Sequence, residues 1–340
     1  MSGNPFAFFK PEIVYIRPEA KEYPLARELE SRFKHMGIPV RTGIPVVDKT
    51  AGAAESYRIA KKTLVISVRR GLSFQSCKPS AHYQLPLATG CPALCEYCYL
   101  QTTLGPRPYL KVYVNVEEIL AKAGEYITRR APEVTVFEGA ATSDPVPMEP
   151  LTHTLGKAVA FFAGSEHGRF RFVTKFHGLE WLAGLEHRDH TEVRVSLNTR
   201  RVIRRFEKGA SSLAHRIGAA RDVLRWGYPL GLMIAPVIIS EDWQGEYRDL
   251  LHEAGRALGP ARGISFEIVT HRYTARAREL IQSRCPDHGL PLDGRDRKFK
   301  VGQFGYGKYV YDAPTMEQVD GFFRTEIPKT FIEPVIRYIV

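Results

Sequence analysis

Three cysteines stand close together in residues 90–99, GCPALCEYCY, with the spacing CxxxCxxC. Thiolates are the usual protein ligands of iron–sulfur clusters, and three of them on one short loop can hold three irons of a cubic [4Fe–4S] cluster. The other two cysteines of the chain, Cys77 and Cys285, lie outside this loop. Cys91, Cys95 and Cys98 therefore predict a cluster whose fourth iron is open to a small molecule.

Two other interpretations of the cysteine loop stay open at this stage. A structural zinc site needs a fourth ligand, for which His82 is the nearest candidate, but paired CxxC or Cys/His spacings are its usual form. A disulfide framework fits less well, because the chain has five cysteines, an odd number, and three of them stand within one short loop. The cluster is the favoured prediction.

The composition excludes several broad classes of protein. The chain of 340 residues has no run of eighteen apolar residues and no signal-peptide pattern at its start, so we expect no membrane span. Thiols suited to iron argue for a reducing compartment, and a cytoplasmic, monomeric protein is expected. Lysine and arginine total 48 against 37 acidic residues, and the resulting charge of +11 fits a nucleic-acid partner.

The first eighty residues favour a small α/β unit. Residues 13–16 and 63–68 have the apolar pattern of strands, and 25–36 repeats large apolar residues at helical spacing. Residues 42–58 are polar and rich in glycine and alanine, which predicts a linker or loop. We therefore expect an N-terminal α/β extension over residues 1–80.

From residue 83 onward, apolar strands alternate with amphipathic helices. Asn115 followed by Glu118 predicts a capping box at the start of one helix, and residues 212–225 predict another helix. Strands separated by helices form a parallel sheet covered by helices. The favoured fold class is α/β, a partial (β/α)6 TIM-like barrel, and a doubly wound open sheet is the alternative. The predicted strands are 83–88, 134–137, 170–174, 193–197, 230–234 and 264–269.

Small and polar residues follow the ends of these strands. In such barrels the chemistry sits at the carboxyl ends of the strands. The cysteine loop follows the first strand, and the turn GAATSD at 139–144 follows the second. Their joint placement, together with the later strand ends, supports a common ligand site on one rim. The later strands end at Lys175, at Ser196 and Asn198, at Ala235-Pro236, and at His271 and Arg272.

The cysteine loop is similar to that of the radical S-adenosylmethionine (SAM) enzymes. In those enzymes SAM binds the open iron, and one electron from the cluster releases a 5′-deoxyadenosyl radical. More specific likenesses are ATGCPALCEYCYLQTTLG, APEVTVFEGAATSDPV, LTHTL, RFRFVTK and GYGKYVY. These segments resemble the spore photoproduct lyase family, which repairs the UV-induced thymine dimer of bacterial spores. The likeness covers nearly the whole chain, and YCYLQTTLG is more discriminating than the cysteine spacing.

The resemblance implies a role for each matching residue. Tyr97 corresponds to the aromatic residue that lies against the adenine of SAM, and Tyr99 to a tyrosine beside the lesion. The implied reaction abstracts hydrogen from C6 of the dihydrothymine, cleaves the methylene bridge between the bases and returns a hydrogen atom to the product radical. SAM is regenerated. The implied cluster ligands are Cys91, Cys95 and Cys98, and the positions expected around SAM are Ser143, Lys175, Ser196 and Asn198.

One departure from the family pattern affects the last step. The resembled enzymes have a cysteine, the hydrogen donor, where this chain has Ala141. Alanine has no S–H bond to give, so clean turnover is expected to be impaired unless another group donates. An engineered substitution, a member with a different donor and altered chemistry are the open explanations. Tyr99, acting through Tyr97, is the favoured substitute donor, and Cys77 is a more distant candidate.

Basic and aromatic residues alternate near the C-terminus around a glycine-rich turn, which predicts a β-hairpin. An enzyme that reaches C6 of a thymine in a duplex must extrude the lesion, which requires cations that grip phosphates and a wedge that fills the gap. Gln303 and Phe304 are the expected tip of that wedge. A second basic patch, 200–205, has a solvated helix face as its equally weighted alternative. The predicted DNA-binding residues are Lys298, Lys300, Gln303, Phe304, Tyr306, Lys308, His271 and Arg272.

The resemblance implies a DNA repair lyase acting on UV-damaged double-stranded DNA, with a reduced flavodoxin or ferredoxin-type protein as electron donor. It divides the chain into the extension at 1–80, a radical SAM core at 81–275 and a C-terminal segment with the hairpin at 276–340. Two alternatives belong to other classes. One is a radical SAM enzyme that modifies RNA or another substrate, and the other is a non-catalytic zinc protein that binds nucleic acid.

Overall fold

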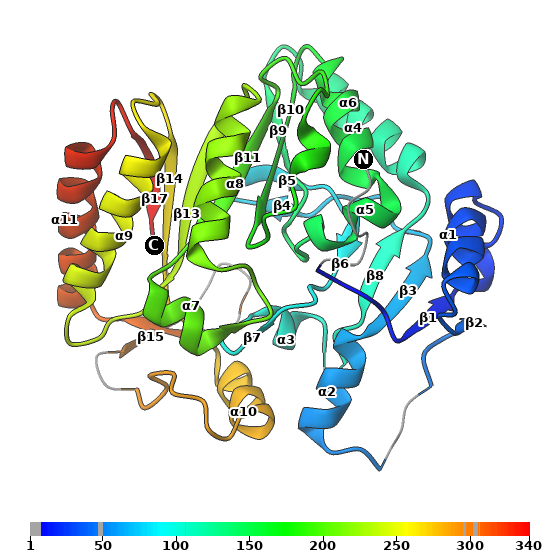
Figure 1. The fold of residues 1–340 in the computed structure, drawn as a ribbon, viewed down its shortest axis with the longest axis horizontal. Coiled ribbons are helices and arrows are strands. Elements are labelled where there is room, and N and C mark those ends of the chain that lie inside the picture. The colour runs from blue at the N-terminus through cyan, green and yellow to red at the C-terminus, as the bar shows by residue number, and fades with distance from the viewer. Residues whose placement is uncertain (1–7, 47–49, 106, 295–296, 302–304, 306) are drawn as a thin grey trace. The chain divides into compact units, whose positions relative to one another are not determined.

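The computed structural model of the protein describes residues 8–46, 50–105, 107–294, 297–301, 305 and 307–340 (Figure 1). The chain divides into two compact units. Unit 1 comprises Met1–Pro92, Leu104–Thr174 and Gly178–Glu192, and unit 2 comprises Ala93–Thr103, Lys175–His177 and Val193–Val340. The boundary at residues 92 and 93 falls inside the cysteine loop, so Cys91 belongs to unit 1, and Cys95 and Cys98 belong to unit 2.

The first sheet of unit 1 has the strand order β2-β1-β3-β8-β6. Strand β3 is buried at every position, as expected for a parallel strand that lies inside a sheet. Ala26, Leu29 and Phe33 of helix α1 pack in the same apolar cluster as Val14 and Ile16. The elements of this part are β1 (Ile13–Ile16), α1 (Pro24–His35), β2 (Val40–Thr42), α2 (Ala53–Lys61), β3 (Thr63–Ser67), β6 (Ala88–Thr89) and β8 (Leu110–Tyr113).

Helix α2 corrects one prediction. The segment 42–58 was expected to be a linker or loop, yet α2 begins at Ala53 inside it. Alanine favours a helix, and Tyr57 and Ala60 stand three positions apart, so both are buried on one face of the helix. The prediction is wrong in the second half of the segment because tertiary burial outweighs the polar composition.

The second sheet of unit 1 has the order β10-β9-β5-β4, in which only the pair β4–β5 is antiparallel. Phe137 of β9 and Phe170 of β10 pack against Phe162 of α6. Helix α4 starts after Asn115 as predicted, but its side chain makes no cap bond and instead accepts the N–H of Arg69 at 2.8 Å. The elements are β4 (Ser76–Cys77), β5 (Ala81–Gln84), α4 (Val116–Arg130), β9 (Thr135–Glu138), α5 (Glu149–Thr152), α6 (Thr154–Ala163) and β10 (Gly168–Thr174).

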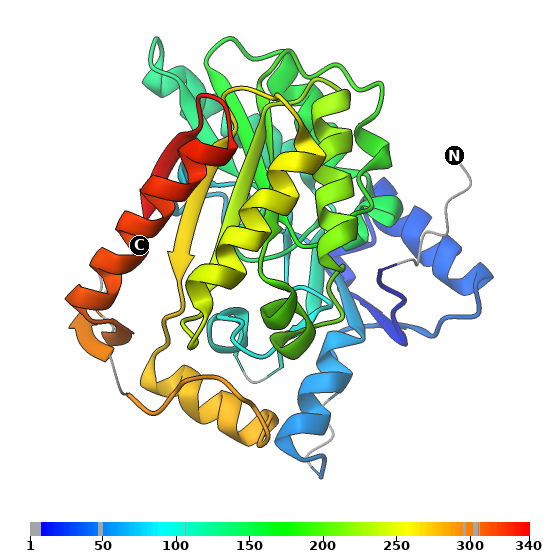
Figure 2. The same ribbon diagram turned by 60° about the vertical axis from the view of Figure 1, so that its left-hand side comes forward.

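The sheet of unit 2 has the order β17-β14-β13-β11, with every neighbouring pair parallel. Helices α8, α9 and α11 lie along one face of it (Figures 1 and 2). Val195 and Leu232 are opposite one another in adjacent strands and are both fully or almost fully buried. The elements are β11 (Thr191–Leu197), α7 (Arg200–Phe206), α8 (Leu213–Arg225), β13 (Leu230–Val237), α9 (Trp243–Leu258), β14 (Ser265–Thr270), α11 (Ala313–Thr330) and β17 (Val335–Ile339).

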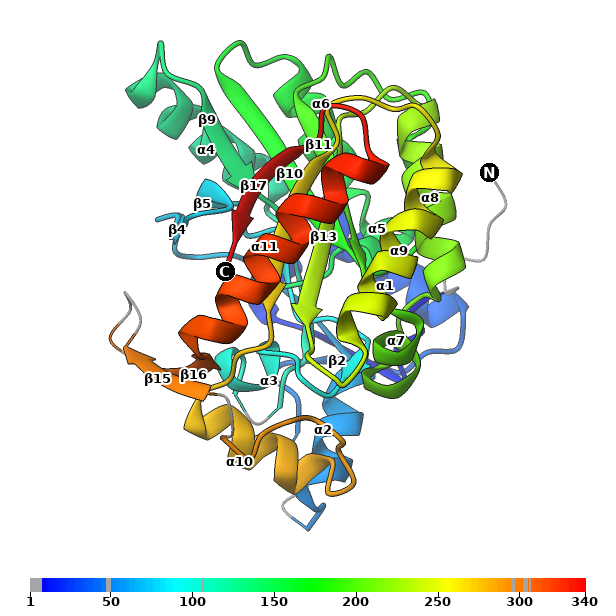
Figure 3. The same cartoon turned by 90° about the vertical axis from the view of Figure 1, so that its left-hand side faces the viewer.

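The remaining elements of unit 2 are short. The predicted hairpin is present as β15 (Arg297–Val301) and β16 (Gly307–Tyr311), next to helix α10 (Ala275–Arg284) (Figure 3). In the cysteine loop, β7 (Leu94–Cys95) is followed by helix α3 (Leu100–Thr103), and β12 (Glu207–Lys208) follows α7. In the part of the chain that the structure describes, no helix is long and apolar enough to cross a membrane.

The predicted elements of the core agree with the structure. Strands predicted at 134–137, 170–174, 193–197, 230–234 and 264–269 correspond to β9, β10, β11, β13 and β14 within three residues at each end. The first predicted strand, 83–88, is broken into β5 and β6, which belong to different sheets. The division of the chain at residues 80 and 275 stays a prediction.

Candidate functional site

The second half of the cysteine loop is fixed within unit 2 by backbone pairing. β7 pairs antiparallel with β12, with Cys95 opposite Glu207. Cys98 donates its N–H to the carbonyl oxygen of Cys95 at 3.2 Å, and the side-chain amide of Gln101 donates to the same oxygen at 3.2 Å. Neither thiol is in a disulfide. The backbone is thus held in place while the two sulfur atoms are left for another partner.

Tyr97, between these cysteines, is held by a buried charge network. Its hydroxyl donates to the carboxylate of Glu207 and accepts from the ammonium of Lys175. Lys175 also donates to Glu207 at 2.7 Å and to the carbonyl oxygen of Ala235 at 2.9 Å. Arg216 completes the network by donating to the other carboxylate oxygen of Glu207. The hydroxyl of Tyr97, and with it the aromatic ring, is therefore fixed by charged side chains of unit 2.

Charge decides the protonation states in this network. Burial would raise the pKa of the Glu207 carboxyl, but the Lys175 and Arg216 cations outweigh it and hold that pKa at about 2. Burial, together with the charge of Glu207, raises the pKa of the Tyr97 hydroxyl well above its ordinary value. Near pH 7 Tyr97 is a neutral phenol that donates, and Glu207 is the carboxylate that accepts.

The first half of the cysteine loop lies against the 139–144 turn within unit 1. Gly90 donates its N–H to the carbonyl oxygen of Thr142 at 2.9 Å, and its own carbonyl oxygen accepts from Asp144 at 3.3 Å. Gly90 has φ +87°, and a Cβ atom there would stand 2.8 Å from the carbonyl oxygen of Tyr109. Only glycine meets both demands. The residue before Cys91 is thereby joined to the turn that carries the predicted SAM residue Ser143.

One carboxylate connects this turn with the segment that precedes the cysteine loop. Glu138, the last residue of β9, accepts from the Ser80 hydroxyl at 2.9 Å and from the backbone N–H of Ala140 at 3.0 Å. Ala141 follows directly. Because Ser80 lies three residues after Cys77, the Cys77 segment and the Ala141 turn are held by the same side chain.

The hairpin carries the exposed Lys298 and Lys300, the half-buried Lys308 and an exposed aromatic ring. Lys300 of β15 stands directly opposite Lys308 of β16, an arrangement of like charges that disfavours a hairpin. Burial and the charges of Arg272 and Lys300 lower the pKa of Lys308. Phe299 is 57 % exposed. No carboxylate pairs with either lysine among the residues described, so the cations are available to an external anion.

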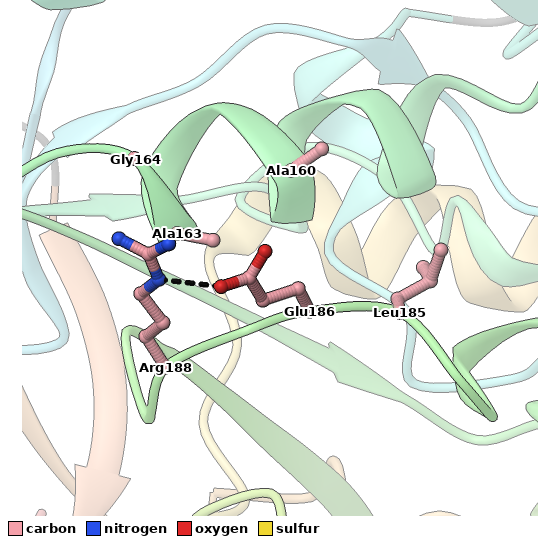
Figure 4. A pocket seen from close by; sticks show the side chains of 6 residues that line it. All are labelled: Ala160, Ala163, Gly164, Leu185, Glu186 and Arg188. Atoms are coloured by element: carbon pink, nitrogen blue, oxygen red, sulfur yellow. Dashed lines mark hydrogen bonds and ion pairs between the residues drawn. The ribbon is translucent and has the colours of Figure 1, made fainter.

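Other predicted residues have different positions. Gln303, Phe304 and Tyr306 lie outside the described residues. In the second basic patch Arg200 and Arg201 form ion pairs of 2.6 Å with carboxylates of α9, which favours the solvated helix face. A hollow on unit 1 contains none of the predicted site residues (Figure 4). It is lined by Ala160, Ala163, Gly164, Leu185, Glu186 and Arg188.

Comparison with known proteins gives one consistent result. The sequence profile of the spore photoproduct lyase family matches residues 9–340. The spore photoproduct lyase of Clostridium acetobutylicum is 46% identical over 334 residues, 96% of this chain and 98% of that protein. The enzyme of Bacillus subtilis is 45% identical over 340 residues, 97% of this chain and 98% of that protein.

The chain belongs to the spore photoproduct lyase family. Solved structures of family members agree. A mutant with bound AdoMet and dinucleoside spore photoproduct has a TM-score of 0.95 at 44% identity, covering 98% of this chain and 100% of that one. A complex with dinucleoside spore photoproduct has a TM-score of 0.95 at 43% identity, covering 98% of this chain and 100% of that one. The α/β partial barrel, the radical SAM lyase class, the [4Fe–4S] cluster and SAM are thereby confirmed as predicted.

In this spore photoproduct lyase family member, two of the residues predicted to bind SAM carry buried hydroxyl groups. Their hydrogen bonding shows whether they suit a polar ligand. Ser143 is 7 % exposed and Ser196 is 1 % exposed, and within the described residues neither Oγ atom has a hydrogen-bond partner. A buried hydroxyl without a partner is costly, so a ligand that bonds to it is favoured. Asn198 differs, because its amide already donates to Pro236 at 2.8 Å and accepts from Tyr247 at 3.0 Å. Its side chain therefore joins β13 and α9, and its position beside SAM stays a prediction.

Two residues of the site were missed by the sequence analysis. Glu207 follows a basic helix in the sequence RRFEKG, and Arg216 lies inside helix α8, so neither belongs to a recognisable motif. Both are fully buried charges that only the folded chain brings together. The roles of individual residues toward cluster, SAM and DNA stay predictions.

Proposed function

We propose that this chain repairs the spore photoproduct in UV-damaged DNA, and that Cys77 returns the hydrogen atom in the final step. The observation that carries the repair function is the match to the spore photoproduct lyase family over residues 9–340, including the cysteine loop. Solved members of that family hold AdoMet and the dinucleoside lesion. When bound, the cluster and SAM supply a 5′-deoxyadenosyl radical that takes the C6 hydrogen of the dihydrothymine.

The chain's own residues position the reactants. Cys91, Cys95 and Cys98 hold the cluster, and Ser143 and Ser196 offer hydroxyls to SAM. Tyr97, fixed by Lys175 and Glu207, presents its ring to the adenine. Lys298, Lys300 and Lys308 grip the phosphates of the strand. A reduced flavodoxin or ferredoxin-type protein supplies the electron. These roles rest on the family resemblance together with the burial and the contacts described above.

Cys77 is supported as the hydrogen donor by its place in unit 1. Its strand β4 pairs with β5, whose partner β9 leads into the 139–144 turn. Glu138 bonds both to Ser80 and to the backbone beside Ala141. Cys77 is half-buried and is not in a disulfide. Of the two cysteines outside the cysteine loop, Cys77 is therefore the one joined within unit 1 to the position where the resembled enzymes carry their donor cysteine.

A solved structure of a relative supports the proposal that a cysteine elsewhere accompanies an alanine at the donor position. The family member with bound AdoMet and lesion is a mutant in which a cysteine is replaced by alanine and a serine by cysteine. The same two residue types occur in this chain, as Ala141 in the turn and Cys77 in β4. The second candidate, Tyr99, is 57 % exposed and lies in unit 2.

The proposed step balances without an external oxidant. Cleavage of the methylene bridge leaves a carbon radical on the released thymine. The S–H bond of Cys77 breaks, and its hydrogen atom forms the C–H bond of the thymine methyl group. The thiyl radical then takes a hydrogen atom from 5′-deoxyadenosine, directly or through Tyr99 and Tyr97, which restores the thiol and allows SAM to be regenerated.

Anaerobic turnover of the dinucleotide lesion tests this proposal. The protein is reconstituted with iron and sulfide, supplied with SAM and a reductant, and run in D2O, where thiol hydrogens exchange. We expect the wild-type chain to release thymidine dinucleotide with deuterium in one methyl group. Cys77→Ser should lose most of this product and its label, and Ala141→Cys in the same chain should restore both.

Two further variants separate the donors. Cys285→Ser removes a thiol of unit 2 and should change neither product nor label. Tyr99→Phe should retain deuterium if the thiol is the direct donor. Cys77→Ser that yields the same labelled product as the wild type would rule out Cys77. A wild-type chain with a reconstituted cluster that leaves the lesion unchanged would rule out the repair function.

A further inference from the structure

Two buried residues at the base of the hairpin, His271 and Tyr273, each carry a polar side-chain atom. His271 follows the end of β14 and is 2 % exposed, and Tyr273 is 4 % exposed. Their ring centroids are 5.8 Å apart. In the part of the chain that is described, neither Nε2 of His271 nor the hydroxyl of Tyr273 has a hydrogen-bond partner. Both atoms are of the kind that a folded protein normally satisfies, so a ligand group is the natural partner.

The hydrogen-bond geometry fixes which nitrogen of His271 carries the proton. The guanidinium of Arg297 lies 3.2 Å from Nδ1. A guanidinium has no acceptor, so Nδ1 must be the acceptor of this bond. Burial and the Arg297 charge lower the pKa of His271 to about 3, so the ring is neutral near pH 7. The single ring proton then sits on Nε2, which is a donor without an acceptor.

Tyr273 is equally well fixed. It stacks on Tyr309 of the hairpin with centroids 5.2 Å apart and exchanges backbone hydrogen bonds with the same residue. Tyr273 also belongs to a buried apolar cluster against which Tyr97 of the cysteine loop packs. The apolar cluster therefore extends within unit 2 from the base of the hairpin to the residue predicted to face the adenine.

The residues around Tyr273 indicate what kind of acceptor group would bind to these two donors. The cluster around Tyr273 is made of Val202, Phe206, Ile238, Ile281, Leu290 and Leu292. The guanidinium of Arg297 lies beside both rings, but it already donates to the carbonyl oxygen and Nδ1 of His271 and lies over the ring of Tyr311. An anion buried against the apolar wall would lose its hydration, whereas a neutral carbonyl oxygen carries a much smaller cost. Two neutral donors beside aromatic rings are the arrangement that recognises the edge of a flipped base.

We infer that His271 and Tyr273 donate hydrogen bonds to carbonyl oxygens of the extruded thymine lesion and so read the base itself. The inference rests on the proposed function. It changes the role of His271 from a general DNA contact to a base contact and adds Tyr273, which no sequence motif indicated. A site whose buried donors are satisfied only by its substrate discriminates strongly against ligands that leave them unpaired.

The test compares lesion ligands with and without a phosphate. Cluster-reconstituted protein with SAM is titrated with the dinucleoside lesion, which has no bridging phosphate, and with the corresponding dinucleotide. Tyr273→Phe removes only the hydroxyl, and His271→Phe removes the ring donor. Each should weaken binding of both ligands by about threefold to tenfold, the effect of one lost hydrogen bond. His271→Gln, which keeps an N–H donor, should recover part of the loss.

The remaining outcomes separate the alternatives. Tyr228→Phe, a buried tyrosine elsewhere in unit 2, is the matched control and should leave both affinities unchanged. Weaker binding of the dinucleotide alone would assign the donors to a phosphate and overturn the base contact. Unchanged affinities for Tyr273→Phe and His271→Phe in a chain that still repairs the lesion would overturn the inference while leaving the proposed function intact.

Discussion

At the scale of single residues, the cysteine loop depends on charges buried beside it. Lys175, Glu207 and Arg216 place two cations around one carboxylate, and the side chains of Glu207 and Arg216 are fully buried. A buried ion pair adds little net stability compared with apolar packing, but it fixes geometry because each charge needs its partner. The network thus explains how a phenol ring between two cluster ligands can be held in one orientation.

Glu207→Gln should therefore be strongly destabilising. The substitution leaves Lys175 and Arg216 buried without a countercharge, a change that costs about 3–5 kcal/mol in other proteins. Urea denaturation followed by circular dichroism measures the free energy of unfolding. Glu253→Gln, which removes the partner of the exposed Arg200, is the control and should cost less than about 1 kcal/mol. Equal losses for both variants would contradict a special role for the buried network.

His271 predicts a stability that depends on pH. Its pKa falls from 6.5 in the unfolded chain to about 3 in the folded chain because of burial and Arg297. The unfolded state therefore binds the extra proton first, so the stabilising contribution is complete above pH 6.5 and declines as the pH falls toward 3. The full contribution is on the order of a few kcal/mol.

Thermal unfolding between pH 4 and pH 7 measures this dependence. The wild-type chain should lose melting temperature as the pH falls, and His271→Gln should flatten part of that decline because glutamine does not titrate. His252→Gln, on the exposed side of helix α9, is the control that should leave the slope unchanged. Parallel curves for wild type and His271→Gln would show that the ring takes up its proton in the folded state.

The sequence alone was enough to predict the residues that carry chemistry. It was not enough to predict the residues that hold them in place. The spacing of Cys91, Cys95 and Cys98 predicts a cluster. Glu207 has no such spacing, and its importance comes from lying opposite Cys95 in a short strand pair. A pairing between residues more than a hundred positions apart leaves no local pattern.

At the scale of elements, apolar runs located the strands well and composition located the helices less well. β10, β11 and β13 are long and buried, so their pattern is unambiguous. Helix α2 was missed because its composition is mostly polar, although Tyr57, Ala60 and Lys61 are buried in the folded chain. Asn115 shows a different failure. The helix begins where predicted, yet the side-chain oxygen of the asparagine accepts from the backbone of Arg69 on another segment instead of from the first backbone N–H groups of its own helix.

Gly307 lies directly against the exposed ring of Phe299. A Cβ atom at Gly307 would lie 2.0 Å from the ring of Phe299 on the facing strand. Gly307→Ala should therefore displace Phe299 or separate the strands, and DNA affinity should fall by about tenfold or more if the hairpin is the wedge. Gly321→Ala in helix α11 has open space around it and should instead add about 0.5–1 kcal/mol of stability.

Fluorescence anisotropy with a lesion-containing duplex measures the affinity, and thermal unfolding checks the fold. Gly307→Ala with unchanged affinity and a normal melting curve would remove the hairpin from the DNA interface. Gly321→Ala controls for the general effect of adding a methyl group, since it lies in the same unit and leaves the hairpin untouched.

At the scale of the whole molecule, the charge of +11 is the property that composition gives directly. Which of the positive side chains can contact DNA depends on the structure. Arg200 and Arg201 are neutralised by carboxylates of α9, whereas Lys300 and Lys308 face each other across the hairpin. Like charges placed opposite one another destabilise the free protein, and a polyanion would relieve that repulsion.

The salt dependence of DNA binding should reflect this difference. Each cation that neutralises a phosphate adds about 0.9 to the slope of log affinity against log salt concentration. Replacing Lys298, Lys300 and Lys308 together by glutamine should lower the slope by about 2.7. Replacing Arg200, Arg201 and Arg225 by glutamine removes the same number of charges from ion-paired positions and should lower it by well under one unit.

The two triple variants carry the same net charge, so they separate position from total charge. Equal reductions in slope would mean that DNA senses only the overall field of the protein, and the hairpin would lose its special role. A reduction confined to the hairpin variant would mean that phosphates lie against β15 and β16. The same titration with a duplex lacking the lesion should give the same slope at lower affinity, because phosphate contacts carry no base information.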